Sequence, residues 1–285
     1  MYVYREIPLR RNGIDLHLDC LALADAAPKK QILLIHGVTY SSREFDIDYR
    51  DYSLSRCLAR NGYAVWSLDI AGYGRSGKVK DGFMPDTAYA AEDIGAAVEK
   101  IVATSGCEKI DLLGWSWGTV TTAAFVKKYP EHIRKLVLVA PILMGVGSMA
   151  VTEPFHRNTW AHAAEDFQTD GAGNIDLNIV EPVMLDLFCS ACWRYDGDTS
   201  PNGGRRDLMK DPTVSLIDVE AISVPTLAIF GDRDPYVNLP ATLPMLPRLP
   251  EGSAVECIPG AAHVAMYEQP YYHDFQQRLL RYLND

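Results

Sequence analysis

The five residues Gly114–Gly118 read GWSWG and stand between an apolar run ending at Leu113 and a helix-like stretch, Thr119–Tyr129. The pattern predicts a tight strand-to-helix turn, because glycines on both sides of Ser116 let the chain pass close to its neighbours. The helix would point its N-terminal N–H groups and positive dipole end at Ser116. We therefore expect Ser116 to be a nucleophile, although this spacing also occurs by chance in a chain with 21 glycines.

A carboxylate and a histidine follow in the order that a nucleophilic serine on such a turn requires. The strand-like run Thr226–Phe230 leads into Asp232 and Asp234, at the end of a strand where parallel sheets place their sites. The next strand-like run, Ala254–Ile258, leads into a loop that holds His263, the candidate base. The residues alone leave Asp232 and Asp234 open as the acid.

Several stretches along the chain resemble the α/β-hydrolase superfamily: His36-Gly37, DIAGYGRS at 69–76, the GWSWG turn, GDRDP at 231–235 and GAAH at 260–263. In that family the second carboxylate of such a GxxDP stretch is the acid, so the resemblance implies Asp234 and leaves Asp232 a supporting or capping role. It also implies that the backbone N–H groups of Val38 and Trp117 form the oxyanion hole. For His36, the backbone after it rather than its imidazole would then carry the function.

The sequence predicts an α/β fold, with a mainly parallel twisted sheet and helices on both faces. Asn12-Gly13 separates two strand-like runs, Val3–Leu9 and Leu16–Ala22, as in a hairpin. Further strands are expected at 31–36, 64–69, 110–113, 136–140, 226–230 and 254–258, with helical stretches such as 86–104 between them. We identify residues 1–143 and 221–285 as the core of an α/β-hydrolase fold.

Residues 144–220 interrupt this alternation of strands and helices. The resemblance implies that this segment is a helical cap inserted before the strand that carries the acid. Its large apolar side chains either line a pocket or pack the cap onto the core, and packing is the better-supported interpretation for each one: Phe155, Trp160, Phe167, Met184, Phe188, Trp193 and Tyr195. We expect Trp115 and Trp117, which flank the serine, and Tyr40 to contact the substrate, a small apolar or aromatic molecule.

The formal net charge of −10 argues against nucleic acid and anionic membranes as partners. No stretch of about eighteen apolar residues occurs, and the first residues lack the apolar run of a secretory signal. We therefore expect a cytoplasmic location. Whether the chain forms a homo-oligomer is left open.

Two motifs suggest a cofactor at first sight. Cys189 and Cys192 form a CxxC pair, but no second pair at metal-binding spacing accompanies them. Gly72, Gly74 and Gly77 spell GxGxxG, but the residues after them read as a loop and not as a helix. The sequence thus predicts no metal and no cofactor.

The residues and the resemblance together favour a serine hydrolase that cleaves a small carboxylic ester, lactone or thioester through an acyl-enzyme. A carbon–carbon bond hydrolase and a cofactor-free perhydrolase use the same triad and are alternatives. A ligand receptor on a hydrolase scaffold is disfavoured, because all three triad candidates are present.

Overall fold

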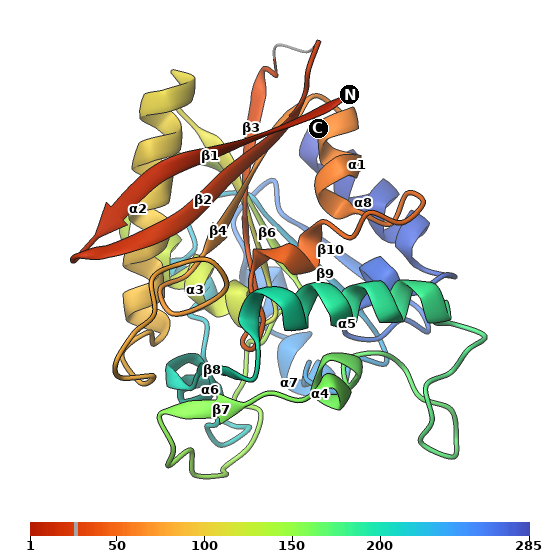
Figure 1. The fold of residues 1–285 in the computed structure, drawn as a ribbon. Coiled ribbons are helices and arrows are strands. Elements are labelled where there is room, and N and C mark those ends of the chain that lie inside the picture. The colour runs from red at the N-terminus through yellow and green to blue at the C-terminus, as the bar shows by residue number, and fades with distance from the viewer. Residues whose placement is uncertain (26–27) are drawn as a thin grey trace.

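A computed structural model describes residues 1–25 and 28–285 and has one large mixed sheet at its centre (Figure 1). The sheet has eight strands in the order β1-β2-β4-β3-β5-β6-β9-β10. The strands are β1 (Tyr2–Arg11), β2 (Ile14–Leu23), β3 (Lys30–Ile35), β4 (Tyr63–Asp69), β5 (Ile110–Trp115), β6 (Ile133–Val139), β9 (Thr226–Gly231) and β10 (Ala254–Ile258). From β4 to β10 all neighbours are parallel, whereas β1 and β2 join one edge antiparallel. The predicted α/β-hydrolase architecture is confirmed.

The hairpin of β1 and β2 turns at Asn12 and Gly13, which both have positive φ angles, 48° and 81°. This is the backbone that a two-residue turn between twisted strands requires, and glycine and asparagine adopt it most readily. The predicted hairpin is therefore present, with strands longer than the apolar pattern indicated. β2 then pairs with β4 and so attaches the hairpin to the parallel sheet.

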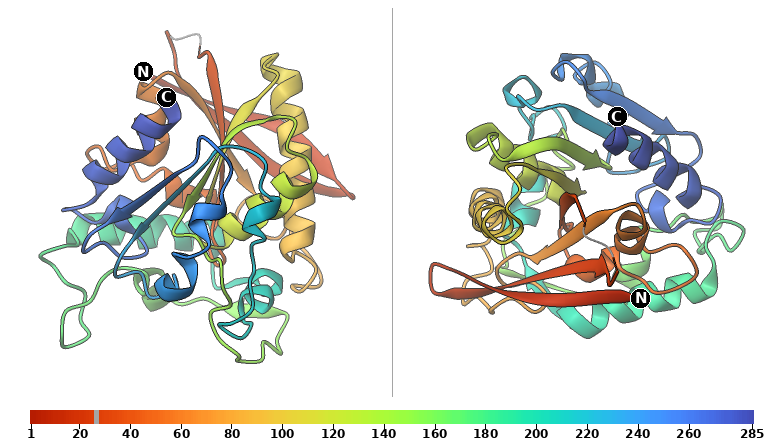
Figure 2. Two further views of the ribbon diagram at one scale, coloured as in Figure 1. Left: turned by 180° about the vertical axis from the view of Figure 1, so that it is seen from behind. Right: turned by 90° about the horizontal axis from the view of Figure 1, so that it is seen from above.

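Helices cover both faces of the sheet, as two views show (Figure 2). The helices are α1 (Leu54–Arg60), α2 (Thr87–Ser105), α3 (Trp117–Lys128), α4 (Trp160–Ala164), α5 (Pro182–Asp196), α6 (Gly203–Leu208), α7 (Leu239–Thr242) and α8 (Tyr272–Asn284), with short 3-10 turns η1 (Ser42–Phe45), η2 (Val219–Ala221), η3 (Leu246–Arg248) and η4 (Ala265–Tyr267). α2 and α3 pack on one face, and α1 and α8 on the other. None of these described helices is long and apolar enough to cross a bilayer.

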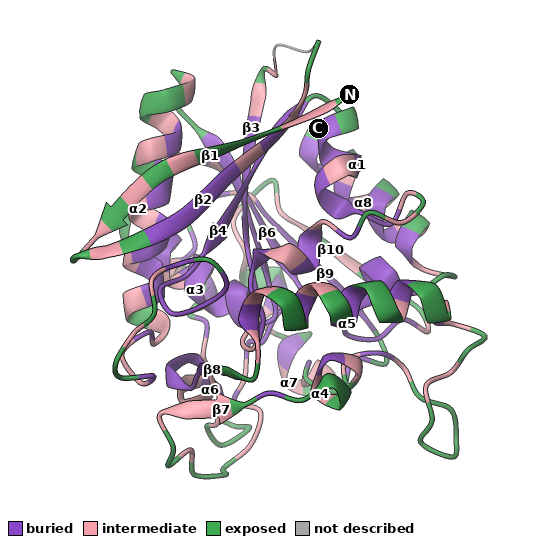
Figure 3. Ribbon diagram, viewed as in Figure 1, coloured by how far each residue is buried: buried purple, intermediate pink, exposed green. Residues whose placement is uncertain are grey.

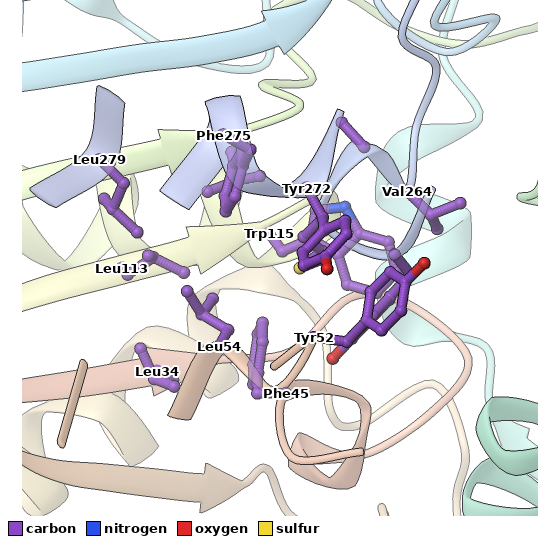
Figure 4. Packing of buried hydrophobic residues seen from close by; sticks show 14 of the residues in the cluster. Leu34, Phe45, Tyr52, Leu54, Leu113, Trp115, Val264, Tyr272, Phe275 and Leu279 are labelled. Carbon is purple, nitrogen blue, oxygen red and sulfur yellow. The ribbon is translucent and has the colours of Figure 1, made fainter. Parts of the chain in front are cut away.

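The central strands of the sheet are buried on both faces, and every residue of β4 and β5 is buried (Figure 3). Two hydrophobic clusters result, one on each side of the sheet. The cluster under α1 and α8 contains Leu34, Phe45, Tyr52, Trp115 and Phe275 (Figure 4). Burial from both sides explains why the parallel strands read as continuous apolar runs.

Residues 144–220 contain a two-stranded sheet of β7 (Phe155–Arg157) and β8 (Thr199–Pro201) together with α4, α5 and α6. They lie beyond the carboxyl ends of the parallel strands, where α5 runs across the molecule (Figure 1). The outer side of α5 is exposed, but Met184, Phe188 and Cys192 on its inner side are buried in the core. The division of the chain into a core and a separate cap stays a prediction.

Candidate active site

Ser116 occupies the turn between β5 and α3 with φ 56° and ψ −122°, a conformation that L-residues rarely adopt. Hydrogen bonds hold the backbone there: the Ser116 N–H donates to the Val139 carbonyl at 3.0 Å, and its own carbonyl accepts the Thr119 N–H at 2.9 Å. The side chain of Ser116 lines a large pocket. The strained turn thus presents the hydroxyl to any molecule in that pocket.

The two glycines of the GWSWG motif are required by close backbone contacts. A Cβ atom on Gly114 would collide with the backbone of Gly118, and one on Gly118 would collide with the Ile35 carbonyl. Both contacts are with main-chain atoms that cannot rotate away. Gly114 therefore lets the two ends of the turn pack together, and Gly118 lets the turn pack against the end of strand β3.

His263 and Asp234 form a buried pair, with His263 Nδ1 2.8 Å from Asp234 Oδ2. Asp234 lies in the loop after β9 and His263 in the loop after β10, so the ends of adjacent parallel strands bring them together. The other oxygen of Asp234, Oδ1, accepts the Tyr236 N–H at 2.9 Å. Because a carboxylate accepts the proton of Nδ1, Nε2 of His263 is left free to accept a proton.

Asp232, the alternative acid, is exposed and accepts the Gly260 N–H at 2.7 Å. It therefore ties the loop after β9 to the loop after β10, which carries His263. The two aspartates therefore have different contacts, in line with the roles that the family resemblance implied. Asp234 is the residue that contacts the imidazole.

The imidazole of His263 is also enclosed by aromatic rings. The Trp115 ring lies 5.3 Å away between centroids, and the Tyr236 ring meets it edge-on at 4.8 Å. The Trp115 Nε1–H donates to the His263 carbonyl at 3.1 Å. Burial lowers the pKa of His263, but the negative charge of Asp234 and its hydrogen bond outweigh burial and leave the pKa above 6.5.

The loop after β3 brings free N–H donors next to the serine. A Cβ atom placed on Gly37 would lie 3.4 Å from Cβ and 3.8 Å from Oγ of Ser116. In residues 1–25 and 28–285 the N–H of Val38 has no hydrogen-bond partner. Trp117 is the first residue of α3, so its N–H has no partner within the helix. Both N–H groups are thus available to an oxyanion formed at Ser116.

Two buried side chains hold this loop in place, and the sequence did not reveal either role. Glu44 Oε1 accepts the Gly37 N–H at 2.9 Å. His36 Nε2 accepts the Ile70 N–H at 3.1 Å, so His36 Nδ1 carries the proton and donates to the Gly37 carbonyl at 2.7 Å. That carbonyl and the Val38 N–H belong to one trans peptide and point in opposite directions. The His36 imidazole therefore sets the direction of the Val38 N–H.

Comparison with known proteins agrees with this geometry. A family model described as "Serine aminopeptidase, S33" matches residues 26–270. The chain belongs to this family of α/β hydrolases. The family description names an activity of other members and says nothing of which bond this hydrolase cleaves.

Individual relatives have different names. A Bacillus subtilis protein named "Uncharacterized carboxylesterase nap" is 23% identical over 272 residues, which cover 91% of this chain and 80% of that protein. A 2-hydroxy-6-oxononadienedioate/2-hydroxy-6-oxononatrienedioate hydrolase of Escherichia coli is 25% identical over 238 residues, covering 79% and 78%. The crystal structure of carboxylesterase CesB from Bacillus subtilis superposes with a TM-score of 0.64 at 18% identity, covering 99% of this chain and 92% of that one. The structural likeness concerns the fold.

The pocket of this hydrolase has a volume of about 720 Å³ and receives side chains from the core and from residues 144–220. Ser116 and His263 both line it, as do the predicted contacts Trp115 and Tyr40. The hydroxyl of Tyr40 is buried and has no partner among the described residues. The predicted substrate contact of Trp117 is wrong for its side chain, which does not line the pocket.

The Trp117 indole is fully buried on the far side of the turn. Its Nε1–H donates to Thr87 Oγ1 at 3.1 Å, and an added Cβ on Gly204 would touch its ring. The side chain of the first helical residue thus points toward α2 and α6, while only its N–H faces the serine. Sequence position next to the nucleophile did not indicate this direction.

Of the apolar residues expected in the cap, Phe155 lines the pocket, whereas Phe167, Met184 and Phe188 pack into the core. Trp160 and Trp193 are largely exposed. The polar lining was not anticipated: it includes Glu44, His156, His162, Asp166 and Arg205. Within the described ranges, no group of three or more His, Cys, Asp or Glu side chains is arranged to hold a metal ion.

Proposed function

We propose that this chain is a serine hydrolase that cleaves a small-molecule carboxylic ester, lactone or thioester through an acyl-enzyme. The observation that carries the proposal is the His263–Asp234 pair, 2.8 Å apart, whose histidine lines the same pocket as Ser116. The relative named as a carboxylesterase supports the ester as the bond. The predictions of a small-molecule partner, rather than nucleic acid or a membrane, and of a cytoplasmic location stay predictions from the sequence.

In the first half of the reaction, His263 Nε2 takes the proton of the Ser116 hydroxyl while Oγ attacks the carbonyl carbon. The N–H groups of Val38 and Trp117 stabilise the oxyanion that forms, by about 3 kcal/mol for each donor. Asp234 stabilises the imidazolium and keeps its orientation. His263 then gives the proton to the leaving group, and Ser116 is acylated.

In the second half, water takes the place of the leaving group. His263 accepts a proton from the water, whose oxygen attacks the acyl carbon. The same two N–H groups stabilise the second oxyanion. Collapse of this intermediate returns the proton to Ser116 and releases the carboxylic acid.

A second candidate function is hydrolysis of a carbon–carbon bond. The Escherichia coli relative is named for the hydrolysis of oxo-dienedioates, and its match spans about four-fifths of both chains. A perhydrolase that uses the same triad remains an alternative of the same kind. A non-catalytic receptor has the least support, because the nucleophile, base and acid are all present.

The test is hydrolysis of p-nitrophenyl esters from acetate to long acyl chains by the native protein, Ser116→Ala and His263→Ala. We expect the native protein to turn over some chain lengths and both variants to lose turnover, with circular dichroism and melting curves unchanged. Substantial activity in either variant would refute the triad. If the native protein cleaves no ester, the ester proposal fails and carbon–carbon hydrolysis becomes the leading candidate.

A further inference from the structure

One cation in the pocket lacks an acidic partner. Arg205, on α6, lines the pocket and donates from Nη1 to Asn202 Oδ1 at 2.8 Å and from Nη2 to Thr39 Oγ1 at 2.7 Å. Both acceptors are neutral. In the part of the chain that the structure describes, no carboxylate oxygen lies within 4.0 Å of this guanidinium.

Other partly buried arginines of this chain form ion pairs with aspartates. Arg43 lies 2.9 Å from Asp19, and Arg56 lies 3.0 Å from Asp46. A buried cation without a counter-charge is costly, since it loses hydration that nothing replaces. Burial accordingly lowers the pKa of Arg205. An anion that enters the pocket would supply the missing charge.

The unused donors of Arg205 suit one kind of anion. A guanidinium has five N–H groups in a planar fork, and the two bonds to Asn202 and Thr39 leave three without a protein acceptor among the described residues. A planar carboxylate accepts two parallel N–H bonds from such a fork. The arrangement therefore favours a carboxylate.

Arg205 also contacts the loop that carries the predicted oxyanion donor Val38. Its partner Thr39 directly follows Val38, whose N–H is free next to Ser116. Gly204, the residue before Arg205, packs against the ring of Trp117. An anion on Arg205 and a carbonyl at Ser116 would occupy the same pocket, so one small molecule can present both.

Among the described residues, none of the acidic side chains that line the pocket forms an ion pair with Arg205. Glu44 is buried, and burial raises its pKa well above the ordinary value. Asp166 acts on Arg205 through space without contact, and burial raises its pKa as well. Glu153, Glu165 and Arg157 line the pocket but are exposed, so solvent screens them.

We propose that Arg205 binds a free carboxylate of the substrate, so that the preferred substrates are esters or thioesters carrying an ionised carboxyl group a short distance from the scissile bond. This inference rests on the proposed ester hydrolysis at Ser116. The carboxylate can stand on the acyl part or on the leaving alcohol. In either position, the group that binds Arg205 is a carboxylate.

The kinetic test compares esters of matched size. Monomethyl glutarate against methyl pentanoate probes the acyl side, and carboxymethyl butanoate against propyl butanoate probes the alcohol side. We expect the native protein to prefer the carboxylated member of at least one pair. In Arg205→Met, the ratio of kcat/KM for that member to kcat/KM for its neutral partner should fall roughly 10- to 100-fold.

Arg206→Met is the matched control. Arg206 stands on the same helix, donates to the Phe83 carbonyl at 3.3 Å and does not line the pocket. Its substitution should leave the preference unchanged. The inference is overturned if the native protein hydrolyses these esters but prefers neither carboxylated one, or if Arg205→Met slows both members of a pair equally, which would limit Arg205 to holding Thr39.

A binding measurement separates this inference from the proposed function. Ser116→Ala protein is titrated calorimetrically with monomethyl glutarate, with methyl pentanoate and with inorganic phosphate, with and without Arg205→Met. Binding of monomethyl glutarate that weakens tenfold or more in the double variant supports the inference even if the native protein hydrolyses no ester. Tighter binding of phosphate, or equal binding of the neutral ester, overturns it even if hydrolysis is found.

Discussion

The Glu44 carboxyl accepts the backbone N–H of Gly37 at 2.9 Å, one residue before the N–H of Val38 that faces the serine. Glu44 comes from the short turn η1 and is buried, and burial raises the pKa of its carboxyl. Together with His36, it fixes the peptide on both sides of Gly37. The direction of an oxyanion donor thus depends on a side chain that does not itself react.

Glu44→Leu should lower kcat roughly 100-fold with a small change in KM, because a donor displaced by about 1 Å no longer meets the oxyanion. Glu44→Gln should stay near the native rate, since a neutral amide oxygen accepts the same N–H. Steady-state kinetics of both variants on one ester check this. Equal losses in the two variants would show that the charge of Glu44 matters rather than its acceptor.

Asp234→Asn should reduce kcat by roughly 10⁴-fold, as expected when the acid of such a triad no longer fixes the tautomer of the base. Asp232→Asn, only two residues away, should keep activity within a few-fold because Asp232 supports a loop and does not contact His263. Kinetics with melting curves for both proteins distinguish the two roles. The opposite order of effects would reassign the acid to Asp232.

The pKa of His263 is raised above 6.5, chiefly by Asp234 acting against burial. Because only neutral His263 accepts a proton from Ser116, kcat/KM should fall as the pH drops through that raised pKa. The charged imidazolium, in turn, contributes stability that is present at low pH and lost as the pH rises through the folded-state pKa. A pH profile of kcat/KM should therefore show an acid limb that moves to lower pH in Asp234→Asn, where only the weaker effects of Asp166 and Glu268 still oppose burial. If the acid limb does not move in this variant, a group other than His263 causes it.

The sequence predicted the fold well because the decisive signals are local. Continuous apolar runs mark the parallel strands, and Asn12-Gly13 marks the hairpin. The serine, aspartate and histidine each follow a strand, and parallel strands bring such positions to one edge of the sheet. Chain order and spacing were enough to predict Ser116 and His263, whereas the choice of Asp234 over Asp232 came from the family resemblance.

Other residues of the pocket depend on packing that no local pattern encodes. Trp117 turns away from the pocket because Gly204, more than eighty residues later, leaves space for its ring. Glu44 and Arg205 carry charge in stretches without clear periodicity, so their sequence reads as solvated surface. Only the folded structure shows that the side chains of Glu44 and Arg205 line the pocket.

Trp117→Phe should lower the free energy of unfolding by about 1–3 kcal/mol, because it removes the hydrogen bond to Thr87 and leaves a cavity. KM should change little, since the indole does not line the pocket. Trp115→Phe, by contrast, changes the pocket wall and frees the His263 carbonyl, so its kinetics should change. Urea unfolding and ester kinetics of the two variants make the comparison. A KM effect confined to Trp117→Phe would contradict the structure.

Asp196, at the end of α5, accepts N–H groups of Ser41 and Gly74, and burial raises its pKa from 3.8 to about 7. Between these two pH values the folded protein binds more protons at this group than the unfolded chain does. Its contribution to stability therefore falls as the pH rises from about 4 to about 7. Asp196→Asn should flatten the pH dependence of the unfolding free energy measured in urea. Asp186→Asn, an exposed change on the same helix, should leave it as in the native protein.

Ser116, Asp234 and His263 stand in loops after β5, β9 and β10, whereas Phe155, Asp166 and Arg205 come from residues 144–220. The continuous segment 144–220 thus supplies much of the pocket lining, and the three residues of the proposed triad lie outside it. Recombination between relatives at the two junctions, after β6 and before β9, would exchange the pocket wall while the chemistry is inherited intact. These two junctions are therefore natural crossover points for changing substrate preference, in evolution and in protein engineering.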